Sequence, residues 1–227
     1  MTQRLNNKRI LITQASDYMG PDIAELFRQH GGEVIEDHSD LTQHGACEKA
    51  IEAAGEIDVL VINLAASAHF GIAATEVSDD IWSEMFDLMV HPLHRLTRAA
   101  LPQMIERKAG KILVIGSATG IKGMAGVSAY SAARAAQVGY IRSAALEVAA
   151  NNIQINLIAQ NWVENPAYFN PEFTNSDEFK QLMANEVPIQ RLATGREDAL
   201  FALFLASNES DFFVGQAIPF SGGWAQS

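Results

Sequence analysis

The sequence has little cysteine and few basic residues, and these shortages exclude several classes of protein. Cys47 is its single cysteine, so no disulfide can form within the chain, which suits a reducing cytoplasm. Its 16 lysines and arginines are outnumbered by 27 acidic residues, and the formal net charge is −11. Nucleic acids and anionic membranes attract clustered basic side chains, so we expect neither as a partner.

Long apolar runs are also missing. No run approaches the roughly 20 residues that span a bilayer, and residues 1–7 lack the apolar core of a signal peptide. We therefore expect a cytoplasmic protein. The length of 227 residues suits one α/β domain with a sizeable core, so we predict a single domain over residues 1–227.

Short β-branched runs alternate with longer helical patterns along the chain. The predicted strands are apolar on both faces, as strands covered by helices on both sides must be, and lie at 9–13, 33–36, 57–62, 111–115, 153–158 and 216–220. This order predicts an α/β fold with a single Rossmann-like, doubly wound parallel sheet flanked by helices on both faces. Ligands of such folds bind beyond the carboxyl ends of the strands.

Three residues beyond the fourth predicted strand form the clearest chemical signal. Ser117 follows that strand directly, Tyr130 comes thirteen residues later, and Arg134 lies four residues further on the same helical face. Alone, a tyrosine four residues before an arginine is more often a core ring beside a surface cation. Together with Ser117, the pair resembles the catalytic unit of the short-chain dehydrogenase/reductase superfamily, which has lysine at the position of Arg134.

The resemblance extends over nearly the whole chain. Asn63-Leu64-Ala65-Ala66 is similar to the superfamily's Asn-Asn-Ala-Gly, and Ser221-Gly222-Gly223 is similar to its terminal Asp-Gly-Gly. After the first strand the superfamily has Thr-Gly-x-x-x-Gly-x-Gly. Here the packing glycine, Gly20, remains, but Gln14 and Tyr18 replace the two glycines that approach the pyrophosphate. We therefore expect no nicotinamide cofactor.

Two other interpretations of the loop and the chain stay open. Tyr18 could point to solvent and leave a dinucleotide site, and Glu36 and Asp37 occupy the position of a ribose-binding acid. The chain would then be an NAD(P)-dependent short-chain oxidoreductase with a divergent phosphate loop. The other alternative is a catalytically silent relative that serves as a binding protein.

The serine–tyrosine–arginine unit combined with an aromatic residue at position 18 resembles the halohydrin dehalogenases, a cofactor-independent offshoot of the superfamily. The resemblance implies a carbon–halide lyase that closes vicinal halohydrins to epoxides and opens epoxides with small anions. Its partners would be a small halohydrin or epoxide and a halide ion. The resemblance also implies a homotetramer built through the helices at 91–107 and 128–150.

The chemistry gives each catalytic residue a role. A free tyrosine has a pKa of about 10, so little phenolate exists at neutral pH. The permanent charge of Arg134 and the positive end of the helix beginning near Ser128 lower the cost of ionising Tyr130, the expected base. Ser117 would hold and aim the substrate oxygen.

A halide and substrate site is expected where fixed dipoles and ring edges can surround an anion. The predicted residues, with the backbone N–H groups of the last three as donors, are Tyr18, Asn165, Pro166, Ala167, Tyr168 and Phe169. We expect no metal site, because His91 and His94 lack a cysteine or carboxylate that would complete a shell.

Overall fold

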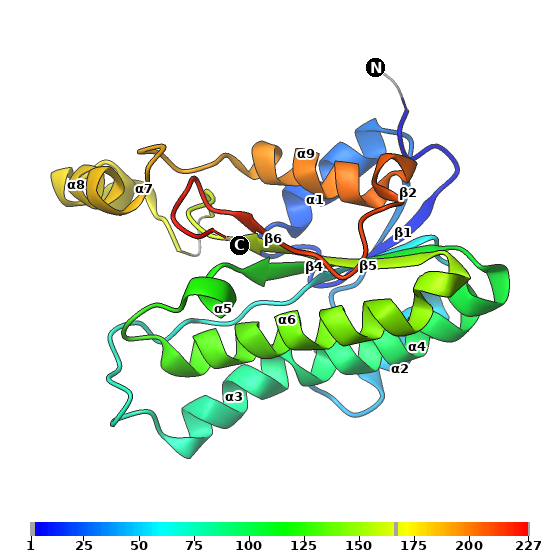
Figure 1. Ribbon diagram of the computed structural model, residues 1–227, viewed down its shortest axis with the longest axis horizontal. Helices are drawn as coiled ribbons and strands as arrows, with labels where there is room; N and C mark the ends of the chain where they lie inside the picture. The colour runs from blue at the N-terminus through cyan, green and yellow to red at the C-terminus, as the bar shows by residue number, and fades with distance from the viewer. Residues whose placement is uncertain (1–2, 166–167, 227) are drawn as a thin grey trace.

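The computed structural model describes residues 3–165 and 168–226 and contains one six-stranded sheet (Figure 1). All neighbouring strands pair in parallel, in the order β2-β1-β3-β4-β5-β6. The strands are β1 (Arg9–Ile12), β2 (Glu33–Glu36), β3 (Val59–Asn63), β4 (Gly110–Ser117), β5 (Ile153–Gln160) and β6 (Ala217–Phe220). The predicted doubly wound parallel sheet is confirmed.

Helices cover both faces of the sheet (Figure 1). One face carries α1 (Gly20–Gln29) and α9 (Gly195–Ala206), and the other carries α2 (Ala46–Ala54), α4 (His91–Arg107) and α6 (Ser128–Val148), with α3 (Asp79–Met89) beside α6. Beyond the carboxyl ends of the strands lie α5 (Thr119–Lys122), α7 (Pro171–Thr174) and α8 (Asp177–Glu186). Two short 3-10 turns, η1 (Ala149–Asn151) and η2 (Asn208–Ser210), follow α6 and α9.

The strands are apolar because each one contributes to two cores. Along β3 every residue is buried, and alternate side chains enter opposite layers. Leu60 and Ile62 pack toward α2, α4 and α6, whereas Val59 and Val61 pack toward α1 and α9. Helices therefore pack on both faces of the sheet and fix the positions of the carboxyl ends of its strands.

Local signals set several helix starts. Thr194 and Glu197 form a capping box at α9, in which each side chain accepts a hydrogen bond from the other residue's backbone N–H. Pro92 lies in the first turn of α4, where a missing N–H costs nothing. No described residues form a group of three potential metal ligands near His91 and His94 or elsewhere. Within the same residues, no helix combines the length and apolar character needed to cross a bilayer.

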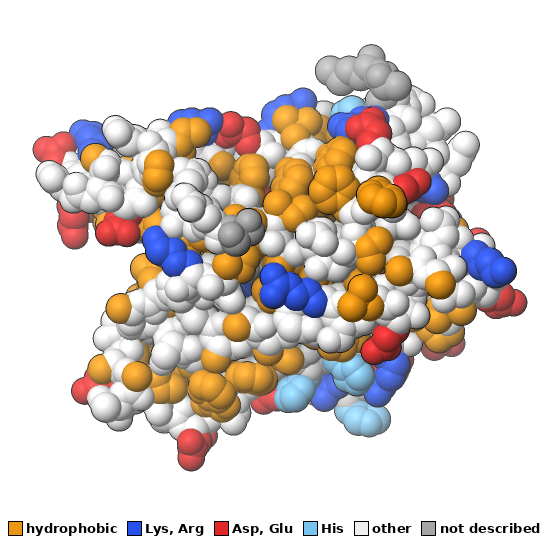
Figure 2. Space-filling model, viewed as in Figure 1, with side chains coloured by type: hydrophobic (Ala, Val, Ile, Leu, Met, Phe, Trp, Pro, Cys, Tyr) orange, Lys and Arg blue, Asp and Glu red, His pale blue; other side chains and the backbone are white. Residues whose placement is uncertain are grey.

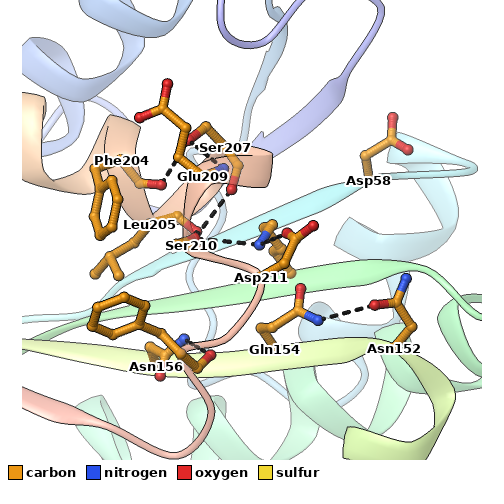
Figure 3. A network of polar contacts seen from close by, with 12 residues as sticks. Asp58, Asn152, Gln154, Asn156, Phe204, Leu205, Ser207, Glu209, Ser210 and Asp211 are labelled. Atoms are coloured by element: carbon orange, nitrogen blue, oxygen red, sulfur yellow. Dashed lines mark hydrogen bonds and ion pairs between the residues drawn. The ribbon is translucent and has the colours of Figure 1, made fainter.

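A polar network ties the segment after α9 to the amino end of the sheet (Figure 3). Lys111, near the start of β4, is buried, and its Nζ lies 2.8 Å from Asp211 Oδ1 and 3.3 Å from Ser210 Oγ. Ser210 Oγ donates in turn to the Leu205 carbonyl at 2.8 Å, and Asn156 Nδ2 donates to the Phe213 carbonyl at 2.7 Å. This edge of the sheet is closed by satisfied polar contacts.

Candidate active site

A cavity of about 380 Å³ opens at the carboxyl ends of the central strands. Its lining is largely apolar, and three of its polar residues come from strand ends: Asn63 from β3, Ser117 from β4 and Gln160 from β5. Figure 2 shows the molecule hollowed on the same side, between the α7–α8 region and the layer below it. The site therefore lies where parallel sheets generally bind ligands.

The three residues of the expected catalytic unit meet in this cavity. Ser117, Tyr130 and Arg134 all line it, and each is less than a tenth exposed. Ser117 ends β4, and its Oγ accepts a hydrogen bond from the Thr119 N–H at 3.2 Å and lies 3.0 Å from Thr119 Oγ1. Tyr130 and Arg134 project from the first two turns of α6. The structure brings the serine, the phenol and the guanidinium together as expected.

Arg134 is surrounded by neutral groups. Its Nη1 donates to the carbonyl oxygens of Leu64 at 2.9 Å and Ile115 at 3.2 Å, and to Gln137 Oε1 at 3.0 Å. The guanidinium carbon lies 5.0 Å from the centre of the Tyr130 ring. Its Nε is buried with no hydrogen-bond partner among the described residues. None of the described carboxylates pairs with this charge, so it acts on Tyr130 and on whatever occupies the cavity.

Two further phenols stand beside this unit. The ring centres of Tyr18 and Tyr168 are 5.6 Å apart, and the Tyr168 hydroxyl donates to the Ala66 carbonyl at 2.8 Å. Burial raises the pKa of both phenols, so both stay protonated and serve as hydrogen-bond donors near neutral pH. Sequence reasoning assigned Tyr168 a role through its backbone and missed this side-chain contact.

The loop after β5 differs in detail from its expected role as an anion cradle. Asn165, Tyr168 and Phe169 line the cavity together with Tyr18, while Pro166 and Ala167 lie outside the described residues. The N–H groups of Tyr168 and Phe169 donate to the Asn165 carbonyl at 3.1 and 2.8 Å. These two donors are therefore engaged within the loop and are not available to an anion.

Three residues immediately after or at the end of β5 were not among the predicted site residues. Gln160, Asn161 and Trp162 line the cavity. Asn161 Nδ2 and Trp162 Nε1 are buried and have no hydrogen-bond partner among the described residues. Their place at a strand's carboxyl end was a usable signal, but the left-handed backbone of Trp162, at φ +60°, was not predictable from the sequence pattern.

The loop after β1 keeps a glycine-like backbone with bulkier side chains. Gln14 and Tyr18 have φ values of +45° and +49°, in the region that glycine favours. Asn63 Nδ2 fixes the turn by donating to the carbonyls of Gln14 and Asp17, both at 2.9 Å. Gly20 packs so closely that a Cβ would lie 2.5 Å from the Ala15 carbonyl oxygen. The turn is preserved, and Tyr18 forms part of the cavity wall.

The chain is similar to known proteins over nearly its whole length. Residues 5–225 match the family model described as enoyl-(acyl carrier protein) reductase. The 3-oxoacyl-(acyl-carrier-protein) reductase of Chlamydia muridarum is 30% identical over 256 residues, covering 99% of this chain and 100% of that protein. An acetoacetyl-CoA reductase of an Acinetobacter species is 31% identical over 189 residues, covering 82% of this chain and 74% of that protein.

Solved structures give the same fold with two different activities in their descriptions. One described as "Dehalogenation enzyme" has a TM-score of 0.89 and 28% identity, covering 98% of this chain and 100% of that chain. One described as Cj0485 dehydrogenase has a TM-score of 0.88 and 26% identity, covering 100% of this chain and 97% of that chain.

The names of the sequence relatives contradict the predicted carbon–halide lyase class and point to an oxidoreductase. That prediction depended on a few positions, chiefly Tyr18 and Arg134, whereas the similarity to reductases extends over the whole chain. A family model matches nearly all residues, and reductases are 30% identical or more over most of their length, in agreement with the fold. The chain belongs to the short-chain dehydrogenase/reductase superfamily.

Proposed function

We propose that this chain is a short-chain oxidoreductase with a divergent phosphate loop. In its site, Tyr130 exchanges a proton with the oxygen of a small, largely apolar carbonyl or alcohol compound. The observation that carries the proposal is the convergence of Ser117, Tyr130 and Arg134 on one cavity. The reductase names of the sequence relatives support the oxidoreductase class.

The proton transfer follows from the neighbours of Tyr130. Ser117 Oγ–H donates to the substrate oxygen and holds it against the phenol. In the reductive direction Tyr130 gives its proton to that oxygen, and the phenolate that forms lies under the Arg134 charge. In the oxidative direction the phenolate takes the proton from the alcohol. Since Arg134 has no carboxylate partner in the described chain, its charge favours the phenolate in both directions.

The cavity limits the size and polarity of the substrate. A volume of about 380 Å³ is near the lower end of ligand pockets, and the walls are largely apolar. Tyr18, Asn165, Tyr168 and Phe169 form part of these walls and are the proposed substrate-binding residues. A short carbonyl compound or secondary alcohol fits this space better than a long or highly charged molecule.

Short-chain oxidoreductases use a nicotinamide dinucleotide as the hydride carrier. The residues of this chain fit the ribose of that cofactor but not its pyrophosphate. Beyond β2, Asp37 Oδ2 is buried without a described partner, where a ribose hydroxyl would be bound. In the loop after β1, Tyr18 places a Cβ and a ring where a pyrophosphate requires bare backbone. The phosphate segment therefore does not fit a dinucleotide while the Tyr18 ring lies against Tyr168.

The test compares the native protein with a variant in which the two missing glycines of the loop after β1 are restored. Small ketones are offered to the protein with NADH or NADPH, and dinucleotide oxidation is followed by absorbance. We expect only slow turnover in the native protein, because a dinucleotide fits only when the Tyr18 ring moves away from Tyr168. The KM for the dinucleotide should be about tenfold lower when Gln14→Gly and Tyr18→Gly are combined, because backbone contact to phosphate is regained. Tyr130→Phe is the matched control and should lose the activity.

Two results would overturn the proposal. One is turnover only in the loop-restored variant, which would mean that the native loop excludes the reaction. The other is the absence of dinucleotide oxidation together with halide release from a vicinal chlorohydrin without any dinucleotide. In that case the activity first inferred from the sequence would replace the oxidoreductase class.

A further inference from the structure

A fully buried acid lies directly behind the active-site cavity. Asp198, in the first turns of α9, is 0% exposed. With Asp198 ionised, we assign the Gln160 amide with its Nε2 toward this carboxyl, 3.1 and 3.2 Å from the two oxygens, because the reverse orientation would place acceptor against acceptor. Each oxygen of a buried carboxylate thereby receives a donor.

Gln160 joins this acid to the catalytic unit. It is the last residue of β5 and is paired in register with Ser117, the last residue of β4. Residues in register on parallel strands, about 4.8 Å apart, direct their side chains to the same face. Both residues line the cavity. With Nε2 held by Asp198, the amide atom left for the cavity is Oε1.

The charges around Asp198 come from few groups. From α1, Asp22 faces it, with Glu25 behind Asp22, and Asp22 lies against Gly195, where a Cβ would come within 2.3 Å of Asp22 Oδ2. From β5 it meets the neutral Gln160. Burial and the Asp22 charge raise the pKa of Asp198 to about 7. The amino end of α9 and the Gln160 N–H groups oppose this rise by stabilising the carboxylate.

We propose that Gln160 is a specificity-determining residue that binds substrate through Oε1, and that Asp198 is the positioning residue that fixes this orientation. The site then favours substrates that carry a hydrogen-bond donor, such as a hydroxyl group, on the carbon next to the oxygen held by Ser117. This assignment rests on the proposed function, since it assumes that Ser117 holds a substrate oxygen.

Protonation of Asp198 reverses the arrangement. A neutral carboxyl carries its own O–H, which donates to Gln160 Oε1 and turns the amide over. The cavity then receives the Nε2–H donors in place of an acceptor. The buried acid thus decides whether the position beside Ser117 accepts or donates a hydrogen bond.

The first experiment measures the coupling without turnover. The side-chain amide signals of Gln160 are followed by nitrogen-15 NMR against pH, with Gln160→Met used to assign them. We expect one transition near pH 7, where Asp198 titrates. Asp198→Asn should abolish it, and Asp22→Asn, which removes an exposed neighbouring charge, should move it to lower pH. A transition that is unchanged in both variants would overturn the role of Asp198.

The second experiment tests the contact with a ligand. Propylene glycol and its monomethyl ether differ by one hydroxyl donor, and their affinities are compared by NMR titration at about pH 8. We expect the glycol to bind about fivefold tighter, and the ratio to fall to about one in Gln160→Met. Equal affinities in the native protein would overturn the assignment of Gln160.

The two experiments separate this proposal from the proposed function. Neither uses a reaction, so a failure to find oxidoreductase activity leaves both results interpretable. If the amide titrates with Asp198 but the two probes bind equally, Asp198 orients an amide that does not contact substrate, and the specificity role is wrong.

Discussion

Two buried cations at opposite ends of the sheet differ in their partners. Lys111, at the amino end, is 7% exposed, and Arg134, at the carboxyl end, is 3% exposed. Lys111 contacts the Asp211 carboxylate and the Ser210 hydroxyl, whereas the described partners of Arg134 are backbone carbonyl oxygens, the Gln137 amide oxygen and an aromatic ring. The Lys111 charge is paired with a carboxylate, whereas the Arg134 charge remains free to interact with Tyr130 or a ligand.

The other buried polar atoms at the two ends of the sheet differ in the same way. At the amino end, Ser210 Oγ and the Asn156 side chain use their polar atoms on described partners. At the carboxyl end, Arg134 Nε, Asn161 Nδ2 and Trp162 Nε1 are buried without one. Unsatisfied buried donors cost free energy, so a folded chain keeps them where a ligand supplies the acceptor. The difference separates a structural edge from a functional edge.

The largest effect should come from the phenol at the functional edge. Tyr130→Phe keeps the ring and removes the proton carrier, so turnover should fall by at least about a thousandfold while the protein stays folded. Turnover is measured by dinucleotide oxidation, and folding by circular dichroism. Activity within tenfold of the native value would remove Tyr130 from the mechanism.

The structural edge supplies the matched control for that variant. Lys111→Met removes the other buried cation at similar volume and should leave turnover unchanged. The free energy of unfolding should fall by about 1–2 kcal/mol, since the remaining Asp211 is half exposed and rehydrates. A loss of turnover comparable to that of Tyr130→Phe would mean that the two edges are not independent.

A smaller effect is expected from the cation of the functional edge. Arg134→Gln keeps hydrogen-bonding capacity and removes the charge that favours the phenolate. Turnover at neutral pH should fall by about ten- to a hundredfold, and the pH–rate profile should move to higher pH. Arg134→Lys, which restores a charge, should recover part of the shift. An unmoved profile in the glutamine variant would leave Arg134 with a packing role only.

The functional edge should also carry a pH-dependent stability that the structural edge lacks. Asp198 has its pKa raised from 3.8 to about 7, so the folded state holds its proton more tightly than the unfolded state. Its contribution to stability is complete below about pH 4 and is lost as pH rises toward 7. In that window the free energy of unfolding should fall by roughly 1 kcal/mol per pH unit relative to Asp198→Asn.

Urea unfolding of both proteins at several pH values measures this difference. Comparing the two proteins removes the contribution of exposed acids, such as Glu197, whose pKa the Arg191 hydrogen bond lowers to about 2. Parallel curves for the native and Asp198→Asn proteins would mean that the buried carboxyl is ionised throughout the window.

Much of the fold and part of the site could be predicted from local patterns. Apolar runs predicted the strands because parallel strands bury both faces. Ser117, Tyr130 and Arg134 were predicted as a unit because their spacing resembles the catalytic pattern of the superfamily. The structure places all three on one cavity, and their catalytic roles remain a prediction.

Other features depend on contacts between distant segments. Asp198 has the sequence pattern of an ordinary acid in the first turn of a helix, and only the packing of α9 against α1 and β4 places it beside Gln160. The engagement of the Tyr168 and Phe169 N–H groups by Asn165 depends on the loop conformation, which composition does not give. The lyase prediction failed for a related reason: it gave two or three divergent positions more weight than the whole chain.

The smallest expected effect is the change in stability when a single hydrogen-bond donor is removed at either end of the sheet. Trp162→Phe removes an N–H that has no described partner, so the free energy of unfolding should change by less than about 1 kcal/mol. Ser210→Ala removes a hydroxyl that donates within the amino-end network and lies against Lys111, and it should cost about 1–3 kcal/mol. Chemical denaturation of both variants measures the difference. If the two costs are equal, the Trp162 donor is satisfied within the folded chain, and the carboxyl edge holds fewer free donors for a ligand than its geometry indicates.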